Sequence, residues 1–225
     1  MKQIRNFVLV GVLFAGGAFA NNLLTNGSFE LGTFVNDGNG EQLLNAGSTT
    51  MTGWTVNGGT GATLSWLNNT NTYGGVATPY GSYFLDLTGY YDTNPFAGVQ
   101  QIVSLAAGNY SLTFYLGSYQ SSTAPKAGGP VSLTATAGTT SNTFTTPSSG
   151  SGNVWGLQTL NFSVATAGNV TISLVGVYAA NHSYLGLDNV DLELVTSGVP
   201  EPAMSIPLAL AGVLFVLGRR KRARP

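Results

Sequence analysis

The stretch GNYSLTFYLG, residues 108–117, decides the fold of this chain. Apolar and polar side chains alternate along it, and a period of two is typical of a β-strand with one buried face. The apolar face carries Tyr110, Leu112, Phe114 and Leu116. Gly108 and Asn109 are turn-forming residues, so we predict that the strand begins there.

Further runs along the chain repeat this alternation. They cover residues 131–135, 160–164, 170–174 and 187–194, with an irregularity predicted near Asn189. Polar, glycine-rich stretches at 118–129 and 145–153 are predicted to be loops, and no helical periodicity of useful length occurs between them. Many short strands joined by glycine-rich turns favour an all-β fold, which we predict to be an antiparallel jelly-roll β-sandwich.

The first 20 residues have the pattern of a secretory signal peptide. Lys2 and Arg5 precede an apolar run at 7–14, and Ala18 and Ala20 form an A-x-A site before Asn21. We therefore predict that residues 1–20 form a short signal helix that is removed on export. The alternative is an uncleaved N-terminal anchor.

The last 28 residues, 198–225, form a three-part tail. Its parts are the motif Val199-Pro200-Glu201-Pro202, an apolar run at 203–218, and a basic end at 219–225 with five cations: Arg219, Arg220, Lys221, Arg222 and Arg224. As a helix the apolar run is about 24 Å long, against about 30 Å of bilayer hydrocarbon. The basic end is expected to stay on the cytoplasmic side, which places Glu201 at the outer face.

This tail resembles the PEP-CTERM sorting signal of Gram-negative bacteria. The resemblance implies an exosortase-type membrane enzyme as partner, transient anchoring in the inner membrane, and delivery to the cell surface or extracellular matrix. The alternative is a permanent single-span anchor. Bacteria with this sorting system often make exopolysaccharide, which is a plausible glycan partner.

Removing both ends changes the charge of the chain. Seven of its eight cations lie in the terminal segments, so residues 21–197 keep Lys126 against eight acids, a formal charge of −7. A domain without clustered Lys and Arg is not expected to bind nucleic acid. The chain has no cysteine, so disulfides do not stabilise it.

The order of several short motifs extends the prediction. They are NLLTNGSFE at 22–30, GWTV at 53–56, YFLDLTG at 83–89, QQIV at 100–103, WGLQ at 155–158 and GLDNV at 186–190. This succession resembles galactose-binding-like β-sandwiches and the carbohydrate-binding modules attached to xylanases. The resemblance implies a structural Ca²⁺ held by Glu30 and Asp188, with the Ser28 carbonyl as a further ligand. The alternatives are that these acids cap turns or bind backbone N–H groups, or that Asp191 or Glu193 replaces Asp188.

Aromatic side chains are the natural sugar-binding groups, because the C–H faces of pyranoses stack on flat rings. Strand alternation and motif position assign Tyr110, Phe114, Phe162, Trp54 and Trp155 to the core. The loop aromatics are the better candidates, among them Trp66, Tyr73 and Tyr80, with Asp86 and Asp92 as acceptors for sugar hydroxyls. The preferred glycan site is a cluster of Tyr90, Tyr91, Asp92 and Tyr119, and the alternative is that these are ordinary scattered surface aromatics.

Catalysis has little support in the sequence. The single histidine, His182, lies in a predicted loop, and neither a cysteine nucleophile nor a G-x-S-x-G motif is present. Glycoside hydrolases use a pair of carboxylates, so the eight acids do not exclude that activity, but their spacing in the sequence does not indicate which two would form a catalytic pair. The expected function is therefore a non-catalytic, exported glycan-binding or matrix protein, with a purely structural surface protein as the alternative.

Overall fold

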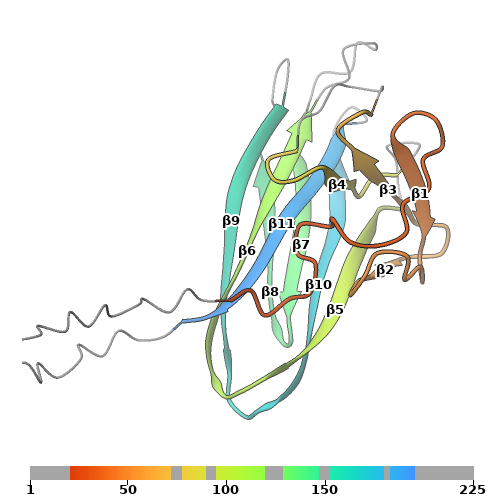
Figure 1. The fold of residues 1–225 in the computed structure, drawn as a ribbon. Helices are drawn as coiled ribbons and strands as arrows, with labels where there is room; N and C mark the ends of the chain where they lie inside the picture. Colours follow the sequence, from red (N-terminus) through yellow and green to blue (C-terminus); the bar gives the residue numbers. More distant parts are fainter. Residues whose placement is uncertain are drawn as a thin grey trace, which may run out of the picture. The chain divides into compact units, whose positions relative to one another are not determined.

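Two antiparallel sheets make up the part of the chain that the computed structural model describes, which is residues 21–71, 78–89, 95–119, 129–146, 153–179 and 183–195. The six-stranded sheet has the order β1-β3-β4-β11-β6-β9, and the five-stranded sheet has the order β2-β5-β10-β7-β8 (Figure 1). All pairings between these strands are antiparallel. The predicted all-β sandwich is confirmed.

The strands of the six-stranded sheet are β1 (Glu41–Asn45), β3 (Thr63–Asn68), β4 (Tyr83–Asp86), β6 (Gly108–Tyr119), β9 (Asn153–Val164) and β11 (Tyr184–Leu194). Those of the five-stranded sheet are β2 (Thr55–Gly58), β5 (Ala97–Leu105), β7 (Val131–Ala137), β8 (Thr140–Thr146) and β10 (Gly168–Ala179). Strand β6 begins at Gly108, as predicted, and β10 begins at Gly168. The predicted loops at 118–129 and 145–153 are shorter at their edges, because Ser118, Tyr119, Thr145, Thr146 and Asn153 belong to strands.

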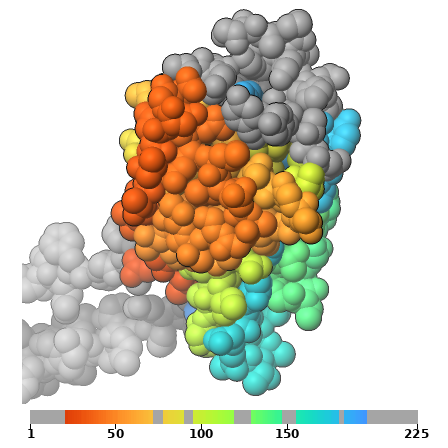
Figure 2. Space-filling model, turned by 90° about the vertical axis from the view of Figure 1, so that its right-hand side faces the viewer, coloured from red at the N-terminus to blue at the C-terminus, as the bar shows by residue number. Residues whose placement is uncertain are grey.

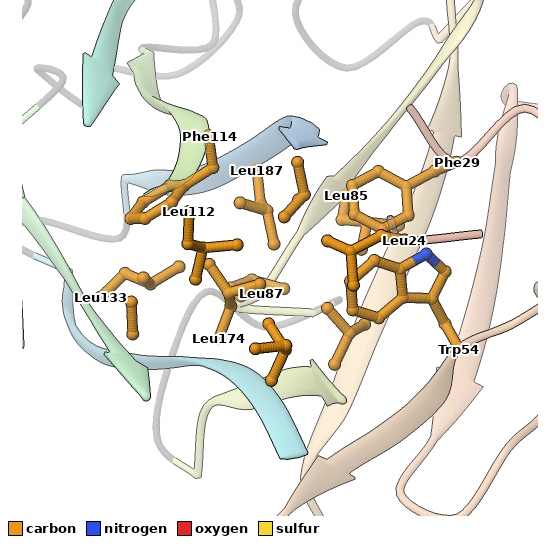
Figure 3. Packing of buried hydrophobic residues seen from close by; sticks show 14 of the residues in the cluster. Leu24, Phe29, Trp54, Leu85, Leu87, Leu112, Phe114, Leu133, Leu174 and Leu187 are labelled. Carbon is orange, nitrogen blue, oxygen red and sulfur yellow. The ribbon is translucent and has the colours of Figure 1, made fainter. Parts of the chain in front are cut away.

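The main core lies between the two sheets. Leu112 and Phe114 of β6 face Leu133 of β7 and Leu174 of β10, while Leu24, Phe29 and Trp54 close the other end of the same cluster (Figure 3). Phe162 and Tyr110 stack with ring centroids 5.5 Å apart. The sequence assigned Tyr110, Phe114, Phe162 and Trp54 to this core correctly, because alternation along a strand fixes which side chains share a face.

Trp66 corrects one prediction. It is not a loop aromatic available to a ligand, because it lies in β3 with only 1% of its surface exposed. Its indole N–H donates a hydrogen bond to the Phe29 carbonyl at 3.1 Å. The ring contacts Phe34 and Tyr83, with centroids 5.2 and 5.4 Å away. Trp66 therefore holds the N-terminal segment to the sheet.

The N-terminal segment of the module lies along its last strand. Leu23 N–H donates to the Leu192 carbonyl, and Val190 N–H donates to the Gly27 carbonyl, both at 2.8 Å. The Asn22 amide donates to the Val190 carbonyl at 2.8 Å. The first and last segments of the described domain therefore lie side by side. The chain from this segment through β3 forms a contiguous face of the molecule (Figure 2, orange).

The chain divides into a compact unit that ends at Leu194 and a second unit, Val195–Pro225. All the described strands lie in the first unit. Residues 1–20 and 196–225 lie outside the described residues, and with them the predicted signal helix, the motif Val199-Pro200-Glu201-Pro202, the predicted helix at 203–218 and the basic end. Within the ranges described, no helix is long and apolar enough to cross a bilayer.

Gly27 gives a direct test of the contact between the chain ends. A Cβ at this position would lie 1.9 Å from the Val190 carbonyl oxygen, so Gly27→Ala must push the N-terminal segment off β11. We expect residues 21–197 carrying Gly27→Ala to lose about 2 kcal/mol of unfolding free energy, measured by urea denaturation. The matched control is Gly168→Ala, where a Cβ meets nothing within 4 Å. Equal stability of the two variants would contradict the prediction.

Candidate functional site

Glu30 and Asp188 hold the same turn from two sides. Glu30 Oε1 accepts hydrogen bonds from the backbone N–H groups of Ser82 and Tyr83, at 2.9 and 2.8 Å. Asp188 Oδ2 accepts one from Tyr80 N–H at 3.3 Å. The two predicted acids are therefore brought together at residues 80–83, and both bind backbone donors there.

The backbone beside both acids is strained. Within the described chain, Asn26, Phe29 and Asn189 are the non-glycine residues with positive φ, at 59°, 58° and 46°. A left-handed conformation is unusual for a bulky residue such as Phe29, and strain of this kind clusters at functional sites. Phe29 directly precedes Glu30 and Asn189 directly follows Asp188. The predicted irregularity near Asn189 is confirmed, because the pairing of β11 with β6 shifts between Asp188 and Asp191.

Burial dominates the electrostatics of this site. Asp188 is fully buried, and its pKa is raised from 3.8 to about 8, chiefly by burial and to a smaller extent by the negative charge of Glu30. The N–H groups of Asn189 and Tyr80 oppose this shift by donating to the carboxylate. The described residues contain neither lysine nor arginine that could compensate the charge. The acid pair is therefore best suited to a proton or an external cation.

The donors for a metal ion are partly present. Ca²⁺ takes about 6–8 oxygen ligands, among which carboxylates and backbone carbonyls are common. Glu30 and Asp188 supply two carboxylates, but no group of three or more His, Cys, Asp or Glu side chains with metal-binding geometry occurs among the described residues. The alternative ligands Asp191 and Glu193 interact with each other: burial first, and then Glu193, raises the pKa of Asp191. In β11 it is Asp188 whose pKa is raised by the negative charge of Glu30, so Asp188 is the acid that lies close to Glu30.

Trp155 forms a platform on the outer face of the six-stranded sheet. In β9 it lies opposite Gly117 of β6, and Gly117 lies opposite Gly186 of β11. A Cβ on either glycine would approach the indole ring to 2.5–2.6 Å, so the ring lies directly over the two glycines. It reaches Phe84 of β4 edge to face, with centroids 5.8 Å apart. The half-buried ring thus extends across β6 and β11.

Further aromatic and apolar side chains lie beside this platform. Tyr80, 42% exposed, contacts Tyr115 of β6 with ring centroids 5.0 Å apart and a 3.0 Å hydrogen bond between the hydroxyls. Tyr115 lies opposite Leu157 of β9, which is 56% exposed. Tyr184 packs with Trp155 against Leu67 and Phe84. Tyr80, Tyr115, Trp155, Leu157 and Tyr184 are called the aromatic patch below.

The aromatic patch differs from the predicted glycan site. Trp155 was assigned to the core, whereas it packs in a separate small cluster outside it. Tyr115 was not nominated, because it alternates with core residues in β6 and its outer face gave no signal of its own. Two glycines in line with Trp155 on neighbouring strands, Gly117 and Gly186, would have indicated a ring lying on the outer face. That alignment is recognisable only when the order of the strands in the sheet is known. Tyr80 was nominated and is exposed.

The remaining predicted binding residues are distributed as follows. Tyr90, Tyr91 and Asp92 lie outside the described residues, as do Tyr73, His182 and the side chain of Tyr119. The Tyr119 backbone pairs with Tyr184 and Asn153 at the end of β6. Asp86 corrects the expectation of an exposed acceptor, because it is fully buried and accepts hydrogen bonds from the Thr88 hydroxyl and the Leu185 N–H.

The raised pKa of Asp188 predicts an unusual pH dependence. Between pH 4 and 8 the unfolded chain releases this proton and the folded chain retains it, so raising the pH favours unfolding. In a chelating buffer we expect the unfolding free energy of residues 21–197 to fall across this range, and Asp188→Asn to flatten the fall. Asp37→Asn, in an exposed loop, is the matched control and should keep it. A profile for Asp188→Asn identical to that of the parent would contradict the assignment.

Comparisons with known proteins place the chain in a family. No curated protein matches its sequence. The chain is similar to the solved structure of TmCBM61 in complex with β-1,4-galactotriose, with 17% identity, a TM-score of 0.46, and coverage of 78% of this chain and 99% of that one. It is also similar to a family 16 carbohydrate-binding module (18% identity, TM-score 0.45, coverage 76% and 99%). A third similar structure is the CBM22-1 xylan-binding domain from Paenibacillus barcinonensis Xyn10C (16% identity, TM-score 0.39, coverage 70% and 94%).

The family described as protein of unknown function DUF642 matches residues 22–190, and the chain therefore belongs to that family.

Proposed function

We propose that residues 21–197 are an exported, non-catalytic carbohydrate-binding module that the C-terminal tail delivers to the cell surface or extracellular matrix. The observation that carries the proposal is the aromatic patch, in which the Trp155 ring is held over Gly117 and Gly186. A flat ring supported by backbone is pre-organised, so little side-chain entropy is lost when a ligand stacks on it.

The composition of the patch suits a sugar chain. Pyranose C–H faces stack on aromatic rings, while hydroxyl groups need polar partners at the rim. Trp155 and Leu157 supply apolar surface, and the paired hydroxyls of Tyr80 and Tyr115 supply donors and acceptors. Tyrosine combines a large apolar face with a polar group, which is the combination that an amphipathic ligand requires.

Charge selects among glycans. The module carries a formal charge of −7, and none of the described residues is a lysine or arginine. Uronates and sulfated polymers would be repelled by such a surface. The preferred ligand is therefore a neutral polysaccharide, with a neutral exopolysaccharide of the producing cell as one candidate.

We further propose that Glu30 and Asp188 hold a structural Ca²⁺, with the Ser28 carbonyl as an additional ligand. The support is the buried carboxylate of Asp188 beside the like-charged, half-buried Glu30, with no cation among the described residues to balance Asp188. A bound Ca²⁺ would supply the positive charge that keeps both carboxylates ionised. The same acids bind the backbone of the turn that carries Tyr80. A bound ion that fixes these acids would therefore also fix the position of Tyr80 in the aromatic patch.

The tail completes the proposal. Pro200, Glu201 and Pro202 are the processing motif for an exosortase-type enzyme, and the apolar run anchors the chain in the inner membrane until that step. The support is the order of motif, apolar run and basic end in the sequence. Export through the inner membrane begins with the signal peptide at residues 1–20.

Glycan binding is tested with purified residues 21–197 on a panel of neutral polysaccharides and one polyuronate. We expect saturable binding to at least one neutral polymer and none to the polyuronate. Trp155→Ala and Tyr80→Ala should each weaken binding about tenfold or more, a loss of at least about 1.4 kcal/mol. Tyr178→Ala is the matched control, since Tyr178 is 51% exposed on β10 of the other sheet. A folded module that binds no glycan would favour the purely structural alternative.

The proposed Ca²⁺ site is tested by measuring the melting temperature of the module with Ca²⁺ and with a chelator. We expect Ca²⁺ to raise the melting temperature of the module more at pH 8 than at pH 5, because the cation offsets the cost of ionising Asp188. Glu30→Gln and Asp188→Asn should abolish the shift, and Asp37→Asn should keep it. A shift that survives in both variants would place the ion elsewhere.

Processing of the tail is tested in cells that contain an exosortase, with the full chain. We expect the double variant Glu201→Ala, Pro202→Ala to accumulate uncut in the membrane fraction, while the parent is shortened and leaves it. Glu193→Gln, an acid of β11 before the tail, is the control. Equal shortening of variant and parent on an immunoblot would contradict the assignment of this motif.

A further inference from the structure

Among the described residues, strand β8 is an unpaired sheet edge without the usual protection. It ends the five-stranded sheet and pairs with β7 from Val131↔Thr146 to Ala137↔Thr140 without a register shift. Natural edge strands are commonly blocked by a charge, a proline or a bulge. The sequence of β8, TSNTFTT, contains neither charge nor proline, and Ser141, Asn142, Thr143 and Thr145 are exposed.

The distribution of charge leaves this side of the molecule neutral. None of the five strands of the β8 sheet contains Asp, Glu, Lys or Arg. Strand β9, which ends the other sheet and contacts β8, is also free of charge. The described acids lie instead at Glu30, Asp37 and on β1, β4 and β11. Two copies with a formal charge of −7 therefore repel each other least where β8 meets β8.

The outward face of β8 is suited to pairing with itself. Its hydroxyls already pair across the strand boundary with β7: Thr145 with Ser132 and Thr143 with Thr134 at 2.8 Å, and Ser141 with Thr136 at 3.1 Å. An antiparallel β8–β8 pair centred on Thr143 places Thr143 opposite Thr143 and Ser141 opposite Thr145. The same hydroxyl pairs would then continue into a second copy, and such cross-strand pairs are stabilising.

We propose that β8 is a homotypic contact through which a second copy of this chain extends the five-stranded sheet, by antiparallel β8–β8 pairing about a two-fold axis at Thr143. One strand edge buries less area than a stable dimer interface of about 1,200–2,000 Å². The contact is therefore weak between free molecules and becomes effective when many copies are held close together on a surface. This inference does not depend on glycan binding.

Site-specific cross-linking tests the contact in cells that express the full chain. The chain has no cysteine, so a single introduced cysteine reports on one position alone. Across the two-fold axis the Cα atoms of Thr143 would lie about 4.5–5.5 Å apart, which is within disulfide range. Under mild oxidation we expect Thr143→Cys to give at least tenfold more disulfide-linked dimer than Thr171→Cys. Thr171 is an exposed residue on the central strand β10 and is the matched control.

The register is tested by a second set of variants. Ser141→Cys alone should not cross-link, because two copies of Ser141 would be about 14 Å apart along the strand. Combined with Thr145→Cys it should cross-link as Thr143→Cys does, and adding Thr143→Lys should lower that yield at least fivefold. A Thr143→Cys yield no higher than that of Thr171→Cys would overturn the proposal. So would efficient cross-linking of Ser141→Cys alone, or capture of a different protein at Thr143.

Discussion

The docking of the N-terminal segment onto β11 is the constraint on which the site depends. Two tryptophan side chains fix that segment: Trp54 donates its indole N–H to the Asn26 carbonyl at 2.8 Å, and Trp66 donates to the Phe29 carbonyl. Asn26 and Phe29 are the left-handed residues of the turn, so the buried indoles hold its strained conformation in place. The close approach of Gly27 to Val190 then aligns the turn with β11, and Glu30 and Asp188 meet at one loop.

A module almost without cations needs another way to bury acids, and this one uses neutral donors. The Asp86 carboxylate accepts from the N–H and hydroxyl of Thr88 and from the Leu185 N–H, and Glu41 accepts from the Ser65 hydroxyl. Hydrogen bonds to a charged group are stronger than neutral ones, so they offset part of the desolvation cost. At Asp188 the N–H donors are outweighed, and burial still raises its pKa. Asp188 and Asp86 also differ in what they bind: Asp86 links Thr88 and Leu185 of β11 to the end of β4, whereas Asp188 binds the N–H groups of Asn189 and of Tyr80 in the turn beside Glu30.

The two faces of the sandwich differ in what they offer to other molecules. The outer face of the six-stranded sheet combines acids, tyrosines and a tryptophan held over glycines. The opposite sheet presents rows of hydroxyl and amide groups without charge, with Asn57 and Ser173 joined at 2.8 Å across its width. The proposed glycan site and the proposed β8 contact use different sheets, because the aromatic patch lies on the six-stranded sheet and β8 ends the five-stranded one.

The sequence alone determined the strands with clear alternation, which are β6, β7, β9, β10 and β11, and their buried faces, because alternation with a period of two is a local property of the chain. It also indicated, through the succession of its motifs, that Glu30 and Asp188 would approach each other. The order of the strands in the sheets decided which side chains from distant parts of the chain lie next to each other. Trp155 and Trp66 each lie in a strand, and only the identity of the neighbouring strands shows that one ring covers Gly117 and Gly186 while the other is buried against Phe34 and Tyr83. Contacts between residues far apart in sequence are set by tertiary packing, and a local pattern carries no information about them.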